Sequence, residues 1–171
     1  PRLHEILQVF EKTSMEICEG QQYDIDFESS TTVAISDYLM MIEKKTALLL
    51  AYSLRIGAYI AGASEQEQDA LFQYGRHIGI AFQIQDDVLD VYGDPSNFGK
   101  AIGGDICCNK KTFLLLTALD IADAESKASL LQWLITSNNN TEKIQAVTAL
   151  YTQLGVREIG EAVMEDHTAE A

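Results

Sequence analysis

Residues 79–90, with the sequence GIAFQIQDDVLD, place three carboxylates in an otherwise apolar helical pattern. Asp86 and Asp90 are four residues apart and share one helix face, whereas Asp87 is turned by about 100° from Asp86. Gln83 precedes them on the same side. Like charges at this spacing repel each other, and more strongly when they leave water. A divalent cation would offset this repulsion. Magnesium fits best because it accepts carboxylates, water and phosphate oxygens.

Lysines flank these aspartates on both sides. Lys45 lies in the preceding apolar segment, Lys100 in the following glycine-rich segment, and Lys110 at the start of the next expected helix. A metal held by carboxylates can bridge to a diphosphate, which also needs positively charged donors. A DDxxD pattern alone would equally fit a solvated acidic face, and each lysine alone would fit a solvated surface group. The combination favours a diphosphate site.

The chain carries helix signals and no sustained period-two alternation, which predicts an all-α fold of antiparallel helices. Ser64 and Glu67 fit a capping box that starts a helix running to about Tyr92. Residues 93–110 hold four glycines and Pro95, so we expect a loop there. Further helices are expected over residues 3–18, about 36–59, about 111–134 and about 141–154. We expect residues 1–171 to form a single domain.

The net charge of the chain and its distribution along the sequence restrict the kinds of ligand that the protein is expected to bind. The 171 residues include 26 acidic and 12 basic ones, a net charge of −14, which disfavours nucleic-acid binding. Residues 44–111 have a net charge of −1, against −13 for the rest, so an anionic ligand is least repelled there. No run of about 18 apolar residues predicts a membrane span.

The cysteines and histidines show no ligand pattern. The three cysteines form no CxxC pair, which disfavours a disulfide framework or a zinc site and favours reduced thiols in a cytoplasmic protein. His4, His77 and His167 are scattered and lack the Glu-x-x-His pairing of a di-iron bundle, so His77 is interpreted as a partly buried polar residue. The sequence starts with proline, which we interpret as a cut within a longer protein.

Five ordered elements between about Glu19 and Gly155 resemble the second half of a trans-isoprenyl diphosphate synthase of the polyprenyl synthetase family. These elements are GQQYD at 20–24, YLMMIEKKT at 38–46, FQIQDDVLD at 82–90, the pair FGK at 98–100 and GDI at 104–106, and NKKT at 109–112. Any one of them would be a weak signal, whereas five in order are specific.

The resemblance implies part of an isoprenoid synthase fold, with antiparallel helices around a central cavity, and a homodimer as the intact protein. It implies Mg²⁺, with Mn²⁺ as an alternative, and condensation of an allylic prenyl diphosphate with isopentenyl diphosphate by ionisation, alkylation and proton loss. Carried over by position, Asp86, Asp87 and Asp90 would hold magnesium directly or through water, and Asp24 would support a metal. Lys45, Lys100 and Lys110 would bind the allylic diphosphate, and Gln21 would contact substrate. Thr46 and Gln83 would face the developing cation beside Lys45, and Phe82 would line the isopentenyl site.

One departure from the family pattern is large. The family has a first aspartate-rich motif followed by an arginine pair, and this sequence contains only one DDxxD. We therefore expect the 171 residues to correspond to the C-terminal portion of a synthase and to be inactive alone. The alternatives are a non-catalytic regulatory or structural subunit, which the retained aspartates and lysines disfavour, and a class I terpene cyclase, which would typically carry an NSE-type motif.

Overall fold

The computed structural model describes residues 2–94, 102–136 and 140–171, and every regular element in these ranges is a helix. In chain order they are α1 (Arg2–Ser29), α2 (Ile35–Ile42), the π-helix η1 (Glu43–Ala47), α3 (Leu48–Ala61), α4 (Glu65–Tyr92), α6 (Gly104–Cys107), α7 (Phe113–Ile121), α8 (Ala124–Ile135), α9 (Asn140–Gln153) and α10 (Val156–Glu170). The prediction of an all-α fold is confirmed.

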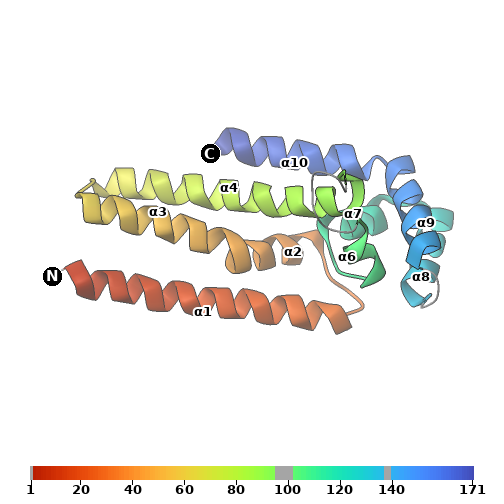
Figure 1. Cartoon of the computed structure of the whole chain (residues 1–171), viewed down its shortest axis with the longest axis horizontal. Coiled ribbons are helices and arrows are strands. Elements are labelled where there is room, and N and C mark those ends of the chain that lie inside the picture. The colour runs from red at the N-terminus through yellow and green to blue at the C-terminus, as the bar shows by residue number, and fades with distance from the viewer. Residues whose placement is uncertain (1, 95–101, 137–139) are drawn as a thin grey trace.

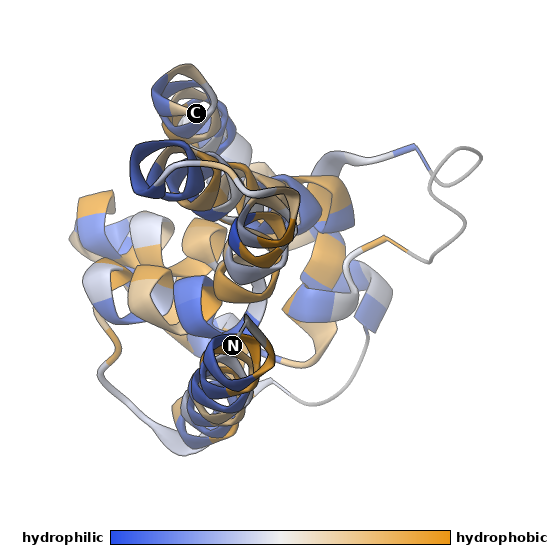
Figure 2. Cartoon of the chain, turned by 90° about the vertical axis from the view of Figure 1, so that its left-hand side faces the viewer, coloured by the Kyte–Doolittle hydropathy of each residue, from blue (hydrophilic) through white to orange (hydrophobic). Residues whose placement is uncertain are grey.

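The four long helices set the shape of the molecule. Helices α1, α3, α4 and α10 lie lengthwise beside one another, and α6 to α9 gather at the end where α4 finishes (Figure 1). Seen nearly end-on, each long helix carries both apolar and hydrophilic residues (Figure 2). The main core forms around the second half of α4, where α2, α7, α8, α9 and α10 contribute buried apolar residues. Its fully buried members include Tyr38, Ile42, Ile84, Leu114, Leu130 and Val156.

The hairpin of α3 and α4 follows its sequence signals closely. Gly62 ends α3 in the left-handed region at φ +86°, where glycine has no Cβ to clash. The Glu67 N–H donates to Ser64 Oγ, and the Ser64 N–H donates to the Glu67 carboxylate at 2.7 Å. The predicted capping box and the end of α4 at Tyr92 are both confirmed.

Several predicted boundaries were wrong. Helix α1 continues to Ser29 instead of ending near residue 18, and the segment 93–110 contains the one-turn helix α6. The helix expected over about 111–134 is two helices, because the Asp123 carboxylate accepts the Ser126 N–H at 2.8 Å and caps a new helix. Helix α10 was not predicted. It packs against α4 and α7.

The π-helix η1 interrupts the helix expected over about 36–59, and glycines surround it. A Cβ on Gly20 of α1 would lie 2.5 Å from the Lys45 backbone nitrogen, and a Cβ on Gly79 of α4 would lie 2.5 Å from the Ala47 Cα. Both distances are shorter than real Cβ contacts. The two glycines therefore let α1 and α4 approach the backbone of η1 from either side.

Among the described helices, none combines the length with the apolar character that crossing a bilayer requires.

Gly79→Ala tests the close approach of α4 to η1. In a helix interior, alanine normally stabilises the folded state by about 1 kcal/mol relative to glycine. At this position, however, its methyl group would clash with the backbone of η1. We expect the free energy of unfolding to fall by about 1 kcal/mol or more in urea titrations.

Gly57→Ala is the matched control, because a Cβ at this exposed position of α3 meets nothing within 4 Å. We expect this change to raise the free energy of unfolding by up to about 1 kcal/mol. Equal effects of the two substitutions would contradict the proposed close contact.

Candidate active site

Asp87 is the most deeply buried carboxylate of the predicted cluster, with 2% of its surface exposed. The Tyr38 hydroxyl donates to its Oδ2 at 2.6 Å, and the Phe113 N–H donates to the same oxygen at 2.9 Å. Asp87 therefore joins α2, α4 and the N-terminus of α7. The partial positive charge of a helix N-terminus favours an anion at this position.

Burial raises the pKa of Asp87 to about 6, although the hydrogen bonds from Tyr38 and Phe113 and the charge of Lys110 oppose the shift. Burial and the Asp87 charge also raise the pKa of the Tyr38 hydroxyl well above its ordinary value. Tyr38 thus stays protonated and keeps donating to Asp87.

Asp86 and Asp90 are half-buried one helical turn apart. The Asp90 Oδ2 accepts the Asp105 N–H at 3.1 Å, and its backbone carbonyl accepts the Gly103 N–H at 2.7 Å, which fixes α6 against the end of α4. Burial raises the pKa of Asp90, and the charges of Asp105 and Asp86 act in the same direction. The Asp86 charge thus contributes, after burial and Asp105, to the raised pKa of Asp90.

Lys45 and Asp24 form a half-buried ion pair between η1 and α1. The Lys45 Nζ donates to the Asp24 Oδ2 at 2.6 Å, and the neighbouring Lys44 donates to Glu19 at 2.6 Å. Gly20 lies between the two acidic residues and provides the close backbone approach. The GQQYD element at 20–24 thus has a physical basis. Its glycine lets α1 approach the backbone of η1, and its aspartate, four residues later, binds Lys45.

Thr46 and Gln83 face each other across η1 and α4. The Thr46 hydroxyl donates to the Gln83 Oε1 at 3.0 Å, so two oxygen atoms with partial negative charge lie side by side. Lys45 and Thr46 are consecutive in η1 and contact different helices, α1 and α4. Single π-turns occur frequently at functional sites.

Lys110 lies just before α7, among carboxylates. Its Nζ is 3.6 Å from the Asp105 Oδ1. Burial lowers the pKa of Lys110, but the charges of Asp105, Asp87 and Asp24 outweigh this effect and the net shift is upward. Lys110 is therefore charged, and it couples electrostatically to aspartates of both α1 and α4.

The backbone before Lys110 is held by two side chains. Asn109 has a left-handed φ of +56°, and its Nδ2 donates to the Leu134 carbonyl at 2.9 Å. The buried Lys143 of α9 donates to the Asn109 Oδ1 at 2.5 Å. A cavity of about 10 Å³, enough for about one water molecule, adjoins Asp87, Lys110 and Lys143.

The structure does not gather every residue that the sequence singled out. Gln21 is exposed on α1, and Phe82 of α4 is 61% exposed, so both side chains face solvent. Lys100 lies outside the described residues. The roles predicted for these three stay predictions.

Sequence reasoning gave no role to Tyr38, Asp105, Asn109 or Lys143. Tyr38 and Asp105 lie within motifs that carry the family resemblance, so their positions were visible but their partners were not. Lys143 had no signal, because an isolated lysine on an amphipathic helix is normally interpreted as solvated.

The oxygen donors fit a hard divalent cation. Asp86 and Asp90 offer carboxylates on one face, and a cation bound between them would offset the burial and the neighbouring negative charges that raise the pKa of Asp90. Asp87 already accepts two hydrogen bonds on Oδ2 inside the core. Its geometry therefore suits it better to positioning the helix than to direct contact with a metal.

The free energy of unfolding of the chelator-treated protein should change with pH as Asp87 ionises. Because the pKa is about 6 when folded and 3.8 for the ordinary group, the folded state holds the proton more tightly. The resulting stabilisation is complete below about pH 3.8 and is lost as the pH rises through about 6. Two pH units correspond to about 3 kcal/mol.

Asp87→Asn keeps an oxygen acceptor for Tyr38 and Phe113 but does not titrate. In urea titrations, we expect the free energy of unfolding of the variant minus that of the unchanged protein to rise by up to about 3 kcal/mol between pH 4 and pH 7. Parallel pH curves for the two proteins would contradict the shifted ionisation.

Known proteins resemble this chain over nearly its whole length. The profile of the family described as polyprenyl synthetase matches residues 1–153. The short chain isoprenyl diphosphate synthase of Methanocaldococcus jannaschii is 43% identical over 144 residues, which cover 84% of this chain and 44% of that protein. A crystal structure of a geranylgeranyl pyrophosphate synthase has a TM-score of 0.91 at 38% identity, covering 98% of this chain and 53% of the other.

A further solved structure is informative about ligands. It is the geranylgeranyl pyrophosphate synthase of Corynebacterium glutamicum complexed with isoprenyl diphosphate and magnesium, with a TM-score of 0.89 at 34% identity over 99% of this chain and 48% of that one. The chain thus spans about half the length of the relatives that it matches. The profile match, the identity and the shared fold together show that this chain belongs to the polyprenyl synthetase family.

Proposed function

We propose that this chain forms the second aspartate-rich half of the active site of a prenyl diphosphate synthase. In this proposal, an allylic prenyl diphosphate is condensed with isopentenyl diphosphate. The observation that carries the proposal is a connected network of charges. Lys45 of η1 pairs with Asp24, and Lys110 before α7 interacts electrostatically with Asp24 of α1 and with Asp87 and Asp90 of α4. The names of the related synthases support the same reaction class.

Magnesium is the proposed ion, with Mn²⁺ as an alternative. Asp86 and Asp90 would hold it, and Asp87 would act through the position of α4. When bound, the ion neutralises the negative charge that develops on the diphosphate leaving group. The synthase of Corynebacterium glutamicum, solved with magnesium and isoprenyl diphosphate, supports this choice.

The Lys45–Asp24 ion pair gives the site a means of responding to ligand. A diphosphate oxygen would compete with Asp24 for Lys45, and a cation would compete with Lys45 for Asp24. Binding of both replaces one ion pair by two, so neither charge is left unpaired at half-buried positions. Lys110 would donate to the diphosphate from the other side, and Lys100 would add a third cation.

Thr46 and Gln83 are proposed to stabilise the carbocation. Their oxygens are held together by the hydrogen bond from Thr46 to Gln83, so their dipoles need little reorganisation when positive charge develops on the allyl group. Gln21 and Phe82 are proposed to contact substrate, with Phe82 at the isopentenyl side. The intact protein is proposed to be a homodimer. The three free cysteines support a cytoplasmic location.

Metal-dependent binding of an allylic diphosphate tests this proposal. We expect the chain to bind geranyl diphosphate more tightly with Mg²⁺ than with chelator in calorimetric titrations. Asp86→Asn should weaken the Mg²⁺-dependent binding by at least about tenfold, because losing one charged partner costs about 1.5 kcal/mol or more.

Asp120→Asn is the matched control, since this exposed aspartate lies on α7 away from the aspartates of α4. It should bind as the unchanged chain does. Binding that ignores both the metal and Asp86 would favour a non-catalytic subunit instead.

Chain elongation is a separate test. A polypeptide of these 171 residues contains one DDxxD motif, whereas the proposed chemistry uses two. When this polypeptide is incubated with Mg²⁺, geranyl diphosphate and isopentenyl diphosphate, we expect that no product with a longer prenyl chain forms. Chromatography of the dephosphorylated products measures this. Any longer product would show that one motif is sufficient.

A further inference from the structure

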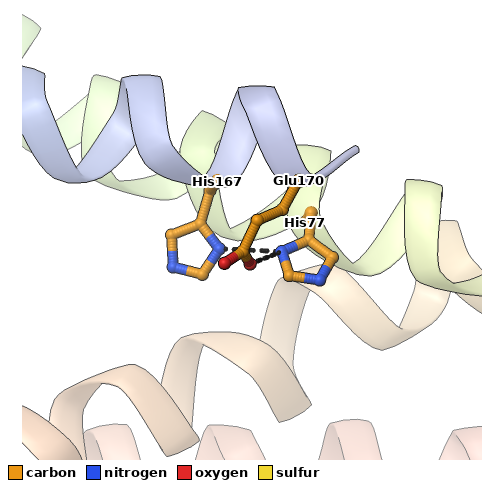
Figure 3. Close-up of side chains that lie close together, drawn as sticks. All are labelled: His77, His167 and Glu170. Atoms are coloured by element: carbon orange, nitrogen blue, oxygen red, sulfur yellow. Dashed lines mark hydrogen bonds and ion pairs between the residues drawn. The ribbon is translucent and has the colours of Figure 1, made fainter.

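A second cluster of potential ligands lies away from the aspartates. Helix α4 contributes His77 and helix α10 contributes His167 and Glu170, and the three side chains point toward one another (Figure 3). The His77 Nδ1 is 3.1 Å from the His167 Nδ1 and 3.1 Å from the Glu170 Oε2. The sequence suggested scattered histidines, but the packing of α10 on α4 brings together residues 90 positions apart.

The spacing of these atoms fits a tetrahedral metal centre. Zinc-to-nitrogen bonds of about 2.0–2.1 Å at tetrahedral angles place neighbouring ligand atoms about 3.3–3.4 Å apart. The two separations from the His77 Nδ1, 3.1 Å each, lie within a few tenths of an ångström of that value, and the ligand atoms of His167 and Glu170 lie within 4.8 Å of each other. Three protein ligands would leave the fourth position to water.

The simpler explanation is a shared proton. A neutral imidazole carries one N–H, so His77 could donate to Glu170 or to His167, but not ideally to both. His167 carries its own N–H, but the His77 Nδ1 can either donate to Glu170 or accept from His167, so one of the two 3.1 Å contacts lacks a well-directed hydrogen bond. A divalent cation would satisfy all three acceptors at once, which is why we favour a metal.

The charges around the cluster agree with cation binding. Burial lowers the pKa of His167, and the charges of His77 and Arg76 act in the same direction, while Glu170 and Asp166 oppose them. Neutral imidazole is the form that binds metals. The Arg76 guanidinium is itself neutralised by two hydrogen bonds of 2.8 Å to the Glu43 carboxylate, which limits its repulsion of a cation.

We propose that His77, His167 and Glu170 bind a divalent transition-metal ion of the zinc class. Imidazole nitrogen selects zinc, cobalt, nickel or copper, whereas Mg²⁺ prefers an all-oxygen site. His77 precedes Asp86 by nine residues, about 14 Å along α4, so this centre is separate from the proposed magnesium site. The bound ion joins α4 to α10 and stabilises the folded state by binding it alone.

Cobalt(II) is the probe, because tetrahedral nitrogen and oxygen ligation gives visible absorption bands that can be titrated. We expect the chelator-treated chain to bind one cobalt ion and to show such bands. Zn²⁺ should displace the cobalt ion, and Mg²⁺ should not. The chain should unfold at a higher temperature with the metal than without it. The spectrum should lack a thiolate charge-transfer band, which would indicate ligation by Cys18, Cys107 or Cys108.

His77→Gln and His167→Gln should each weaken cobalt binding by at least tenfold, since loss of outer-shell partners alone costs about 10- to 100-fold. Glu170→Gln should weaken it too. His4→Gln is the matched control, because His4 is exposed on α1 and outside the cluster, and Asp86→Asn separates this site from the aspartates. Both controls should bind cobalt normally, whatever the result for geranyl diphosphate.

Thermal unfolding in chelator shows whether each variant is folded, and a variant that is not is replaced by the corresponding asparagine substitution. Unchanged cobalt binding in a folded His77 or His167 variant would overturn the proposal. The same holds if the unchanged chain gives no tetrahedral spectrum, a result that would leave the cluster as a proton-sharing pair.

Discussion

A buried carboxylate, Asp87, fixes the geometry of the candidate active site. An ionised group inside a core costs several kcal/mol unless it is hydrogen-bonded, so α2 must deliver the Tyr38 hydroxyl and α7 must begin at Phe113. The start of α7 in turn sets where Lys110 lies, three residues earlier. The positions of Lys110 before α7 and of the half-buried Asp86 and Asp90 on α4 thus depend on one interior contact. Substituting Asp87 would therefore disturb the site even if its oxygens never touch a metal.

The π-helix η1 supplies the second constraint, and small residues make it possible. Gly20 and Gly79 admit the backbone of η1 between α1 and α4 at distances that any side chain would prevent. Where η1 packs between these two helices, the Lys45 side chain contacts α1 and the Thr46 side chain contacts α4, although the two residues are adjacent in sequence.

The sequence predicted those features whose signals are local. The capping box at Ser64 and the length of α4 depend on neighbouring residues, and both were predicted correctly. The break at Asp123 was also local, because aspartate is a preferred helix cap, but the sequence analysis predicted one uninterrupted helix there. By contrast, α- and π-helices use the same residues, so nothing local announces η1. The burial of Asp87 and the meeting of His77 with His167 depend on which helix packs on which face, and no spacing rule contains that information.

One helix, α4, can serve two chemically different sites because of its periodicity. Nine residues separate His77 from Asp86, which corresponds to a rotation of about 180° between their side chains. His77 therefore faces α10, whereas Asp86 is directed to the opposite side of the helix. The first proposed site combines two imidazole nitrogens with one carboxylate, whereas the second offers only oxygen ligands, so the two sites would favour softer and harder cations respectively. A cation at the histidines would fix α10 on α4, and α10 also packs against α7, the helix whose N-terminus binds Asp87. The two sites are thus mechanically connected through packed helices without sharing a ligand.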